Sequence, residues 1–144
     1  MIPVPQAAID LIRQFEGCRL KAYQDQSGVW TQGWGHTGHD ITVSKEISQS
    51  QADLWLHEDA QRACNSVQHL VVVPLTQNQL AALTSFAFNL GIGAFGGSTM
   101  LKILNAGGYD LVPEQLCRWA HVGQKEVEGL KRRREAEANL WKIA

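Results

Sequence analysis

The sequence predicts an α+β fold in a single domain, residues 1–144, with a small antiparallel β lobe near the N-terminus followed by a larger helical lobe. Residues 20–47 have the β-branched, aromatic and glycine composition of strands and turns, whereas the segments on either side have helical spacing and capping signals. A chain of 144 residues with 44% hydrophobic residues also suits one core. We expect a ligand cleft between the two lobes.

The first helix is predicted over residues 5–16, where Pro5 suits the first turn and Gly17 suits the position after the end. One face of this helix carries the apolar side chains of Ala8, Ile9, Ile12 and Phe15. From residue 20 to residue 47 a small twisted sheet is expected, because strand-forming residues are interrupted by glycines that favour turns.

Further helices are predicted in series after the sheet. Ser48 with Gln51, and Thr76 with Gln79, match the capping-box pattern that precedes an apolar periodic run. Ser98 is the expected N-cap of the next helix. The last two helices are expected at roughly 110–120 and 130–142, where the pattern is amphipathic.

Composition excludes several classes of protein. The net charge is −1, divided as −3 over residues 1–72 and +2 over residues 73–144, without the clustered basic face that nucleic-acid binding demands. Three widely spaced cysteines fit neither a disulfide framework nor a zinc ribbon, so we expect a reducing compartment. No apolar run is long enough to span a membrane, and the first residues lack the pattern of a signal peptide. We therefore expect no stable membrane association.

Glu16 is the first candidate for chemistry. In the last turn of a helix the macrodipole disfavours a carboxylate by about 0.3–1 kcal/mol. A carboxyl there beside apolar Phe15 favours its protonated form, which a general acid working near neutral pH requires. The alternative is that Arg19 or one of the arginines at 132–134 simply neutralises Glu16.

Asp25 and Thr31 are the second and third candidates. Asp25 opens the turn sequence Asp-Gln-Ser-Gly, and Thr31 is an ordinary strand residue, so both also have purely structural explanations. In a strand, however, Thr31 shares its face with Gly33 and Gly35, and this bare surface suits the close approach of a ligand.

Two carboxylates on opposite walls of a cleft, with a hydroxyl that holds a water beside one of them, are what glycoside hydrolysis needs. One carboxyl protonates the leaving oxygen, and the other acts from the far side of the sugar ring. The spacing of Glu16, Asp25 and Thr31 is compatible with this chemistry, although by itself it is a signal of moderate specificity.

Three stretches resemble the phage endolysins of the T4-type lysozyme family. "FEGCRLKAYQDQSGVWTQGWGHTG", residues 15–38, matches the catalytic segment, in which Glu is followed after eight residues by Asp or Cys, after five more by Thr, and then by Gly-x-Gly-His. "LTQNQLAALTSFAFNLGIGAFGGSTMLKILNAGGY" resembles the central helices, and "GLKRRREAEANLW" resembles the closing helix. The similarity extends from Ala8 to Trp141.

The resemblance implies a lysozyme-like fold and a muramidase that cleaves the β-1,4 bond between N-acetylmuramic acid and N-acetylglucosamine in the glycan strands of peptidoglycan. It implies Glu16 as general acid, Asp25 as the carboxylate that stabilises positive charge or activates water, Thr31 as the residue that orients this water, and inversion at the anomeric carbon. No cofactor is required, and a monomer is expected. The candidate substrate-binding or supporting residues are Trp34, His36, Arg133 and Arg134, of which Arg133 or Arg134 would pair with Glu16.

The sequence departs from the family in two respects. Gln32 stands where Ile or Val is usual. The membrane signal-anchor of many relatives is not found, so either the protein waits in the host cytoplasm for a holin before it reaches the periplasm, or the sequence begins after such a segment. We expect the +2 half of the chain to face the anionic wall.

Four rival interpretations are weaker. His36, His39 and Asp40 are possible zinc ligands of an amidase, but their spacing matches no strong zinc signature, and His36 is better explained as a hydrogen-bonded structural residue, so no metal is expected. Residues 91–96 satisfy G-x-G-x-x-G, but they follow a helical run and are expected to form a turn rather than a dinucleotide site. Intact Asp25 and Thr31 argue against a lytic transglycosylase, and intact Glu16 argues against an inactive wall-binding module.

Overall fold

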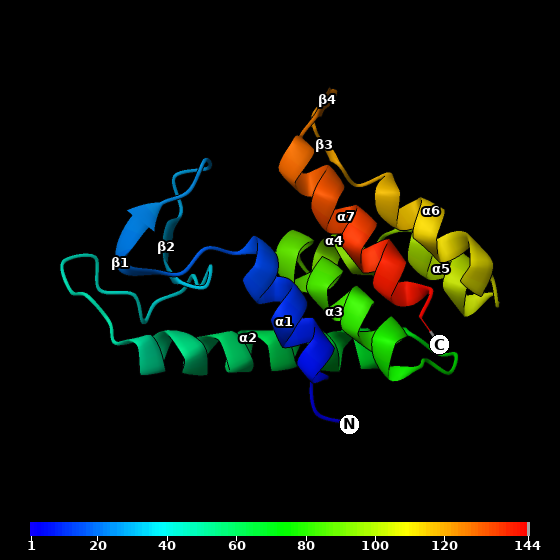
Figure 1. Ribbon diagram of the computed structural model, residues 1–144, viewed down its shortest axis with the longest axis horizontal. Helices are drawn as coiled ribbons and strands as arrows, with labels where there is room; N and C mark the ends of the chain where they lie inside the picture. The colour runs from blue at the N-terminus through cyan, green and yellow to red at the C-terminus, as the bar shows by residue number, and fades with distance from the viewer. Residues whose placement is uncertain (144) are drawn as a thin grey trace.

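The computed structural model describes residues 1–143, which form seven α-helices, one short 3-10 helix and two antiparallel sheets of two strands each. In Figure 1 the first sheet and the loop after it form the lobe on the left, most of the helices form the lobe on the right, and α2 runs beneath both. The predicted α+β fold with a β lobe and a helical lobe is confirmed.

Helix α1 spans Gln6–Phe15 and is shorter than predicted at both ends. Pro5 occupies the N-cap position, where its missing N–H is harmless. Glu16 has extended backbone angles, φ −92° and ψ 124°, although its N–H still bonds to the carbonyl of Ile12. The expectation that Glu16 lies within the last turn is therefore wrong, and its side chain projects from the chain just after the helix.

The first sheet pairs β1, Arg19–Gln24, with β2, Trp30–Gly33, and the strands are joined by a tight turn at Asp25. The prediction of a sheet as far as residue 47 is wrong, because β2 ends where Gly33 and Gly35 adopt φ of 68° and 82°. Such angles reverse the chain at little cost only for glycine.

Gln32 fastens the loop that follows β2. Its side chain is fully buried, and its Nε2 donates to the carbonyls of Leu20 in β1 and Lys45 in the loop, both at 2.8 Å. An apolar residue could pack in the same place but could not satisfy these two carbonyls. The departure from the family pattern at Gln32 thus has a structural use, which is to join loop and strand without a third strand.

Three predicted N-caps are confirmed. The Ser48 and Thr76 side chains accept from the N–H groups of Gln51 and Gln79, and Ser98 does the same for its own helix. Thr76 and Gln79 form the full reciprocal box. Each such cap is worth about 0.5–2 kcal/mol. These residues begin α2, Gln49–Leu70; α3, Gln77–Leu90; and α5, Thr99–Asn105.

The remaining elements differ from the prediction in their bounds. Residues expected to form an interhelical turn instead form a short helix, α4, Ile92–Gly96, which begins after Gly91 with φ of 95°. The predicted helix at 110–120 is reduced to η1, Tyr109–Leu111, and α6, Val112–Cys117, and the last helix, α7, spans Glu128–Trp141. A hairpin that was not predicted from the sequence lies between α6 and α7. It consists of β3, His121–Val122, and β4, Lys125–Glu126.

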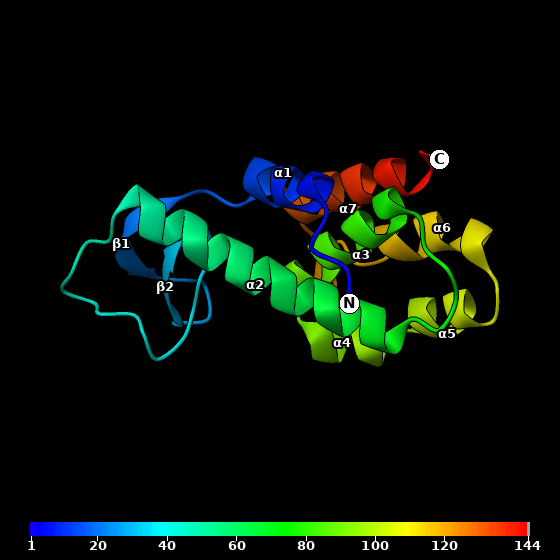
Figure 2. The ribbon, with the colours of Figure 1, turned by 90° about the horizontal axis from the view of Figure 1, so that it is seen from below.

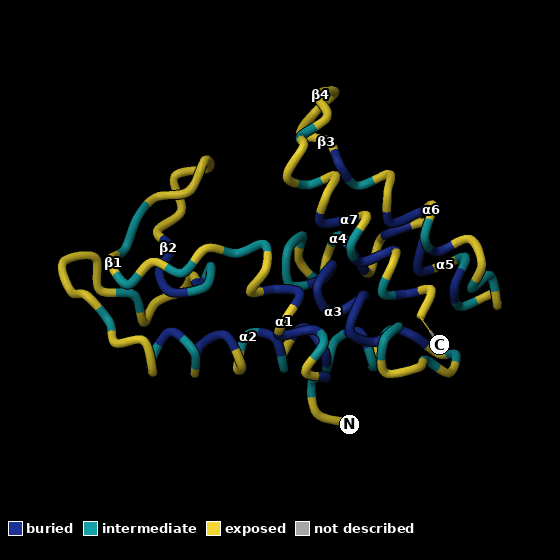
Figure 3. Tube along the Cα trace, viewed as in Figure 1, coloured by how far each residue is buried: buried dark blue, intermediate teal, exposed yellow. Residues whose placement is uncertain are grey.

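The main core lies in the helical lobe, where α3 packs against α1, α2, α4 and α7, and buried side chains of α5 and α6 complete it. A smaller cluster of Ile9, Ile12, Leu56 and Ala60 joins α1 to α2. Figure 2 shows α2 running from under the β lobe to the helical lobe, with α1 beside α7. Figure 3 shows the dark, buried trace concentrated in the helices, whereas the tips of both hairpins are exposed.

Within residues 1–143, no helix combines the length and the apolar character needed to cross a membrane.

Candidate active site

Two adjoining cavities form the cleft between the lobes. The smaller, of about 410 Å³, is lined by all three candidate chemical residues, Glu16, Asp25 and Thr31. The larger, of about 1150 Å³, extends from the end of α1 to the β3–β4 hairpin. Glu16 and Asn89 line both. The fold therefore brings the three residues together at a point from which a longer groove continues.

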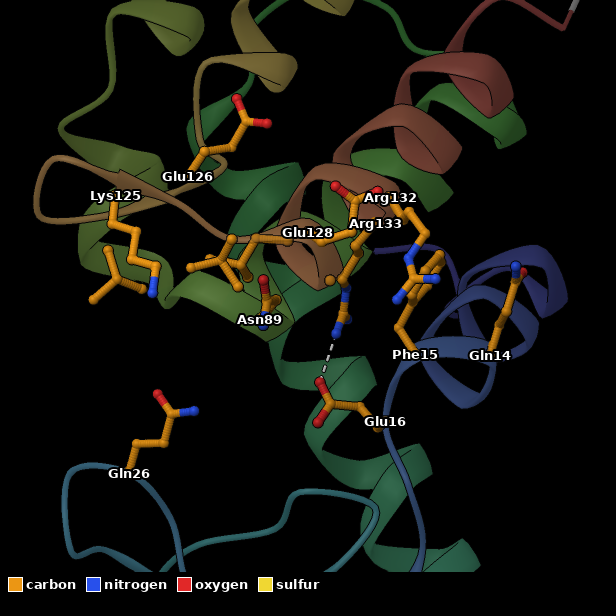
Figure 4. Close-up of a pocket in the computed structure, with 14 residues that line it drawn as sticks. Gln14, Phe15, Glu16, Gln26, Asn89, Lys125, Glu126, Glu128, Arg132 and Arg133 are labelled. Carbon is orange, nitrogen blue, oxygen red and sulfur yellow. Dashed lines mark hydrogen bonds and ion pairs between the residues drawn. The ribbon is translucent and has the colours of Figure 1, made fainter.

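Glu16 projects into this cleft and is held from the side of the helical lobe. Its Oε2 lies 2.6 Å from Nη1 of Arg133, 117 positions along the chain, as the dashed line in Figure 4 marks. From the other side the chain at Gly35 approaches so closely that a Cβ there would lie 2.9 Å from Oε1. The carboxyl thus fits between a guanidinium and a backbone that has no room for a side chain.

Arg133 is the arginine that pairs with Glu16, and Arg134 is not. Arg133 is 3% exposed and also donates to the carbonyl of Ser85 at 3.3 Å. Arg134 turns into the helical lobe, where its Nε lies 2.7 Å from Oε1 of Glu137 and its Nη2 donates to Asn89. The prediction that Arg133 or Arg134 pairs with Glu16 is confirmed for Arg133, and Arg134 points elsewhere because adjacent residues on a helix point about 100° apart.

The structural explanation offered for Glu16 is confirmed, and the chemical one stays a prediction. Its carboxyl is paired with an arginine, as the structural explanation required, and it also lines the cleft, where a general acid would have to lie. Arg19, the other candidate partner, stacks over the ring of Tyr23 at 4.5 Å.

Asp25 is held by its own turn. Its Oδ1 accepts from the backbone N–H groups of Ser27 at 2.8 Å and Val29 at 2.9 Å, and Gly28 takes the left-handed angle, φ 79°, that the turn needs. This is common aspartate turn chemistry. Among residues 1–143, Oδ2 has no hydrogen-bond partner. One oxygen therefore fixes the turn while the other remains available to the cleft.

Thr31 is 4% exposed and donates its hydroxyl hydrogen to the carbonyl of Val29 at 3.0 Å. The lone pairs of Oγ1 are then free to accept a hydrogen bond. The prediction that Thr31, Gly33 and Gly35 share a bare face open to a ligand is partly wrong. Gly35 lines the cleft, but a Cβ on Gly33 would lie 3.3 Å from that of Ala52, so Gly33 packs on α2.

Trp34 lies behind the cleft and does not line either of the two cavities. Its Nε1 donates to Asp53 on α2 at 2.9 Å, and the cation of Arg13 lies over its ring at 5.6 Å. Hydrogen bonds from Trp34 and Gln49 hold the pKa of Asp53 below its usual value. Trp34 thus supports the β lobe on α2.

His36 also supports the β lobe from behind. Its two ring nitrogens lie 2.7 Å from Asp59 and 2.8 Å from Asp40, and its ring stacks on Trp55 with centroids 4.1 Å apart. The hydrogen bond with His36 lowers the pKa of Asp40. His36 and Asp40 thus satisfy one another, and no group of three or more potential metal-binding side chains occurs within residues 1–143.

Several residues that line the cleft were not predicted from the sequence, and Tyr23 and Asn89 are two of them. Tyr23 lies on β1, where burial raises the pKa of its phenol and the negative charges of Glu16 and Asp25 raise it further, while Arg19 acts in the opposite direction. Its spacing of two from Asp25 was the available signal, since alternate strand residues share a face. No sequence pattern pointed to Asn89, because its position in the cleft depends on how the C-terminal end of α3 packs.

The comparisons with known proteins agree on one family. The sequence model of the phage lysozyme family, described as "Phage lysozyme", matches residues 13–137. The endolysin of Acyrthosiphon pisum secondary endosymbiont phage 1 is 41% identical over 145 residues, which is 98% of this chain and 99% of the relative. The endolysin of Bacillus phage B103 is 40% identical over 140 residues, or 96% of this chain, but the chain spans only about half of that relative, 53%.

A solved structure gives the same result. The muramidase domain of SpmX from Asticaccaulis excentricus superposes with a TM-score of 0.91 at 34% sequence identity, and the match covers 100% of both chains. Because the family model matches residues 13–137 and an endolysin is 41% identical over nearly the whole of both chains, the chain belongs to the phage lysozyme family.

Proposed function

We propose that the protein is a muramidase that hydrolyses the β-1,4 bond between N-acetylmuramic acid and N-acetylglucosamine in peptidoglycan. One observation carries the proposal: Glu16 from the helical side and Asp25 with Thr31 from the β side line the same cavity. This is the pair of carboxyl groups that glycoside hydrolysis uses, with a hydroxyl beside one of them.

In the proposed reaction, Glu16 donates a proton to the glycosidic oxygen as the bond to the anomeric carbon breaks. Arg133 and the Gly35 backbone fix the direction in which this carboxyl points. A water held on the β-lobe side of the cleft, next to Asp25 and Thr31, then attacks the anomeric carbon. Asp25 accepts its proton, and the sugar leaves with a new hydroxyl in the inverted configuration.

Thr31 favours water over direct attack by Asp25. Because its hydroxyl already donates to Val29, it can act toward a water as an acceptor. A water that donates one hydrogen to Thr31 and one to Asp25 directs its remaining lone pairs elsewhere, toward the sugar. This arrangement requires the wider carboxyl separation of about 6.5–9.5 Å between Glu16 and Asp25.

We further propose that the protein acts as a monomer on the periplasmic wall after holin-dependent release from the host cytoplasm. Phage endolysins at about 40% identity support a role in attack on the cell wall. The cleft itself contains both candidate carboxyl groups, so a second copy is not needed to complete it.

Analysis of the products from purified peptidoglycan tests the proposed function. First-formed α-anomeric reducing ends, followed by NMR, are the expected result. A β-anomer would mean retention, and 1,6-anhydro ends in the mass spectrum would mean a lytic transglycosylase. If the wall were bound but not cut, the protein would be a binding module.

Glu16→Gln is the matching variant, since the amide keeps the shape of the side chain but cannot donate a proton to the leaving oxygen. We expect a loss of about 10²–10⁴-fold or more in hydrolysis. Glu46→Gln, an exposed change of the same charge in the loop, is the control. Dialysis against EDTA should leave the rate unchanged, whereas activity lost and then restored by zinc would favour an amidase.

A further inference from the structure

A buried ionic cluster lies behind Glu16, and the proposed chemistry does not account for it. Arg133, Arg134 and Glu137 are 3%, 0% and 0% exposed, and all three come from a single stretch of α7. Buried charges are costly unless they are paired. The cluster is therefore held by many contacts, and they end at Glu16.

Glu137 is the centre of this cluster. Its Oε2 accepts from the Ser85 hydroxyl at 2.6 Å and from Nη2 of Arg134 at 3.0 Å, and its Oε1 lies 2.7 Å from Nε of Arg134. The same Oε2 lies 3.6 Å from Nε of Arg133. One carboxyl therefore contacts two guanidiniums, and one of these is the guanidinium that pairs with Glu16.

Arg133 is consequently held at both ends of its guanidinium by hydrogen bonds and lies close to Glu137 at its Nε. Its Nε end faces Glu137, its Nη2 donates to the Ser85 carbonyl, and its Nη1 reaches Glu16 at 2.6 Å. Its guanidinium also lies over the ring of Phe15, 6.0 Å from the centroid. A planar group fixed at several points cannot swing away, so the position of Glu137 determines where Arg133 presents its donor to Glu16.

The charge of Glu137 matters as well. Arg133 places a positive charge 2.6 Å from Oε2 of Glu16, and the role proposed for Glu16 is to donate a proton. The negative charge of Glu137 offsets part of this positive field. Without it, Arg133 and Arg134 would act on Glu16 as two uncompensated cations.

We propose that Glu137 is a positioning residue for the candidate acid: through Arg133 it fixes the direction of the Glu16 carboxyl, and its negative charge offsets part of the positive field of the arginines at Glu16. This proposal rests on the proposed function for its kinetic consequence only. The contacts themselves, from Glu137 through Arg133 to Glu16, are those of the folded protein.

The other titratable groups around the cluster are few. Tyr23 and Asp25 face Glu16 from the β lobe, and Cys117 of α6 lies near Arg134 and Glu137. Burial raises the pKa of Glu137, while both guanidiniums and the Ser85 hydroxyl act against that shift by favouring the carboxylate.

The first test compares Glu137→Gln with Glu135→Gln. Both remove one negative charge from α7, but Glu135 is exposed to solvent. On purified peptidoglycan, we expect the alkaline limb of the pH profile of kcat/KM to move to lower pH by about one unit in Glu137→Gln and not to move in Glu135→Gln. An unmoved limb in folded Glu137→Gln would overturn the proposal.

A second readout does not depend on activity. In carboxyl-detected NMR of the uniformly ¹³C-labelled protein, the titration midpoint of Glu16 should move to lower pH in Glu137→Gln. If the wild type failed to cleave peptidoglycan but this midpoint moved, the proposed function would fail while the electrostatic link remained. An unmoved midpoint would contradict the link whatever the activity.

Glu137→Asp covers the case in which the glutamine variant does not fold. It keeps the charge but shortens the side chain by one methylene, so the alkaline limb should stay in place while kcat falls about 10-fold or more with KM unchanged, because Arg133 loses its fixed position. A Glu137→Asp protein with wild-type kcat would show that Glu137 does not position the acid.

Discussion

The two walls of the cleft hold their carboxyl groups by opposite means. On the helical side, Glu16 is fixed by Arg133, which is itself buried and held by Glu137 and Ser85. On the β side, Asp25 is exposed and fixed by the N–H groups of residues two and four positions ahead of it. One carboxyl depends on the packing of three helices, and the other depends on a turn.

The difference follows from what each carboxyl is proposed to do. A proton donor must be positioned accurately, and the buried guanidinium of Arg133 holds the Glu16 carboxyl in one direction. A residue that handles water needs contact with solvent, and a turn at the rim of the cleft provides this. Variants of the helical wall should therefore affect the pH dependence, and variants of the β wall should affect the rate at every pH.

On the β side of the cleft, the largest effect is expected from Asp25→Asn. The amide oxygen can still accept from Ser27 and Val29, so the turn should be retained and the melting temperature should change little. The rate should fall about 10²–10⁴-fold because the amide cannot accept a proton from water. Asp110→Asn, at an exposed position, is the control.

Asp25→Cys sharpens this test. The family resemblance allows Cys at this position, so this variant should retain more activity than Asp25→Asn. Near wild-type rates in Asp25→Asn would mean that Asp25 only stabilises its turn and takes no part in the proposed reaction.

Gly35→Ala tests the contact between the walls. Its Cβ would lie 2.9 Å from Oε1 of Glu16, and its φ of 82° strains any side chain. Displacing the acid by about 1 Å should cost about 10²-fold in rate. Gly107→Ala, with φ of 92° and open space around the position, supplies the same backbone strain without the contact. Equal losses in the two variants would mean that strain alone is responsible.

Low pH should destabilise the β lobe, because it weakens the hydrogen bonds of Trp34 with Asp53 and of His36 with Asp40. The pKa values of Asp53 and Asp40 are lowered by hydrogen bonds from Trp34 and His36. Since each folded-state pKa lies below its unfolded value of about 3.9, these contacts stabilise the fold above that pH and are lost as the pH falls through the folded values.

Melting temperatures between pH 6 and pH 3 measure this effect. Asp53→Asn keeps an acceptor for Trp34 and should show a smaller decrease at low pH than the wild type. The same slope in both proteins would mean that other carboxyl groups control the acid limb.

The smallest effect concerns salt. Lys125 and Arg132 line the larger cavity, and no ion-pair partner is found for either within residues 1–143. If they attract the anionic wall, raising the ionic strength should lower activity through screening, and Lys125→Gln should reduce that dependence. Lys102→Gln on α5 is the control. A rate independent of salt would contradict the hypothesis that Lys125 and Arg132 attract the anionic wall.

Much of the β wall was predictable because its contacts are local. The turn at Asp25, the strand position of Thr31 and the N-caps at Ser48 and Thr76 each depend on residues a few positions away. The error in the length of the sheet came from the run of glycines. They marked turns correctly, but they did not reveal that the chain would leave the sheet at Gly33 and be fastened by Gln32 instead.

The sequence by itself determined the order of the candidate residues, the α+β class and the turn that presents Asp25, because these follow from periodicity and short-range hydrogen bonds. Only the tertiary structure decided which of three consecutive arginines reaches Glu16, that Glu137 stands behind it, and that Gly35 closes against it. Helical spacing shows that neighbouring arginines point in different directions. Whether an arginine of α7 reaches Glu16 at the end of α1 depends on how these two segments pack. They lie more than a hundred residues apart in the chain, and no local pattern contains that information.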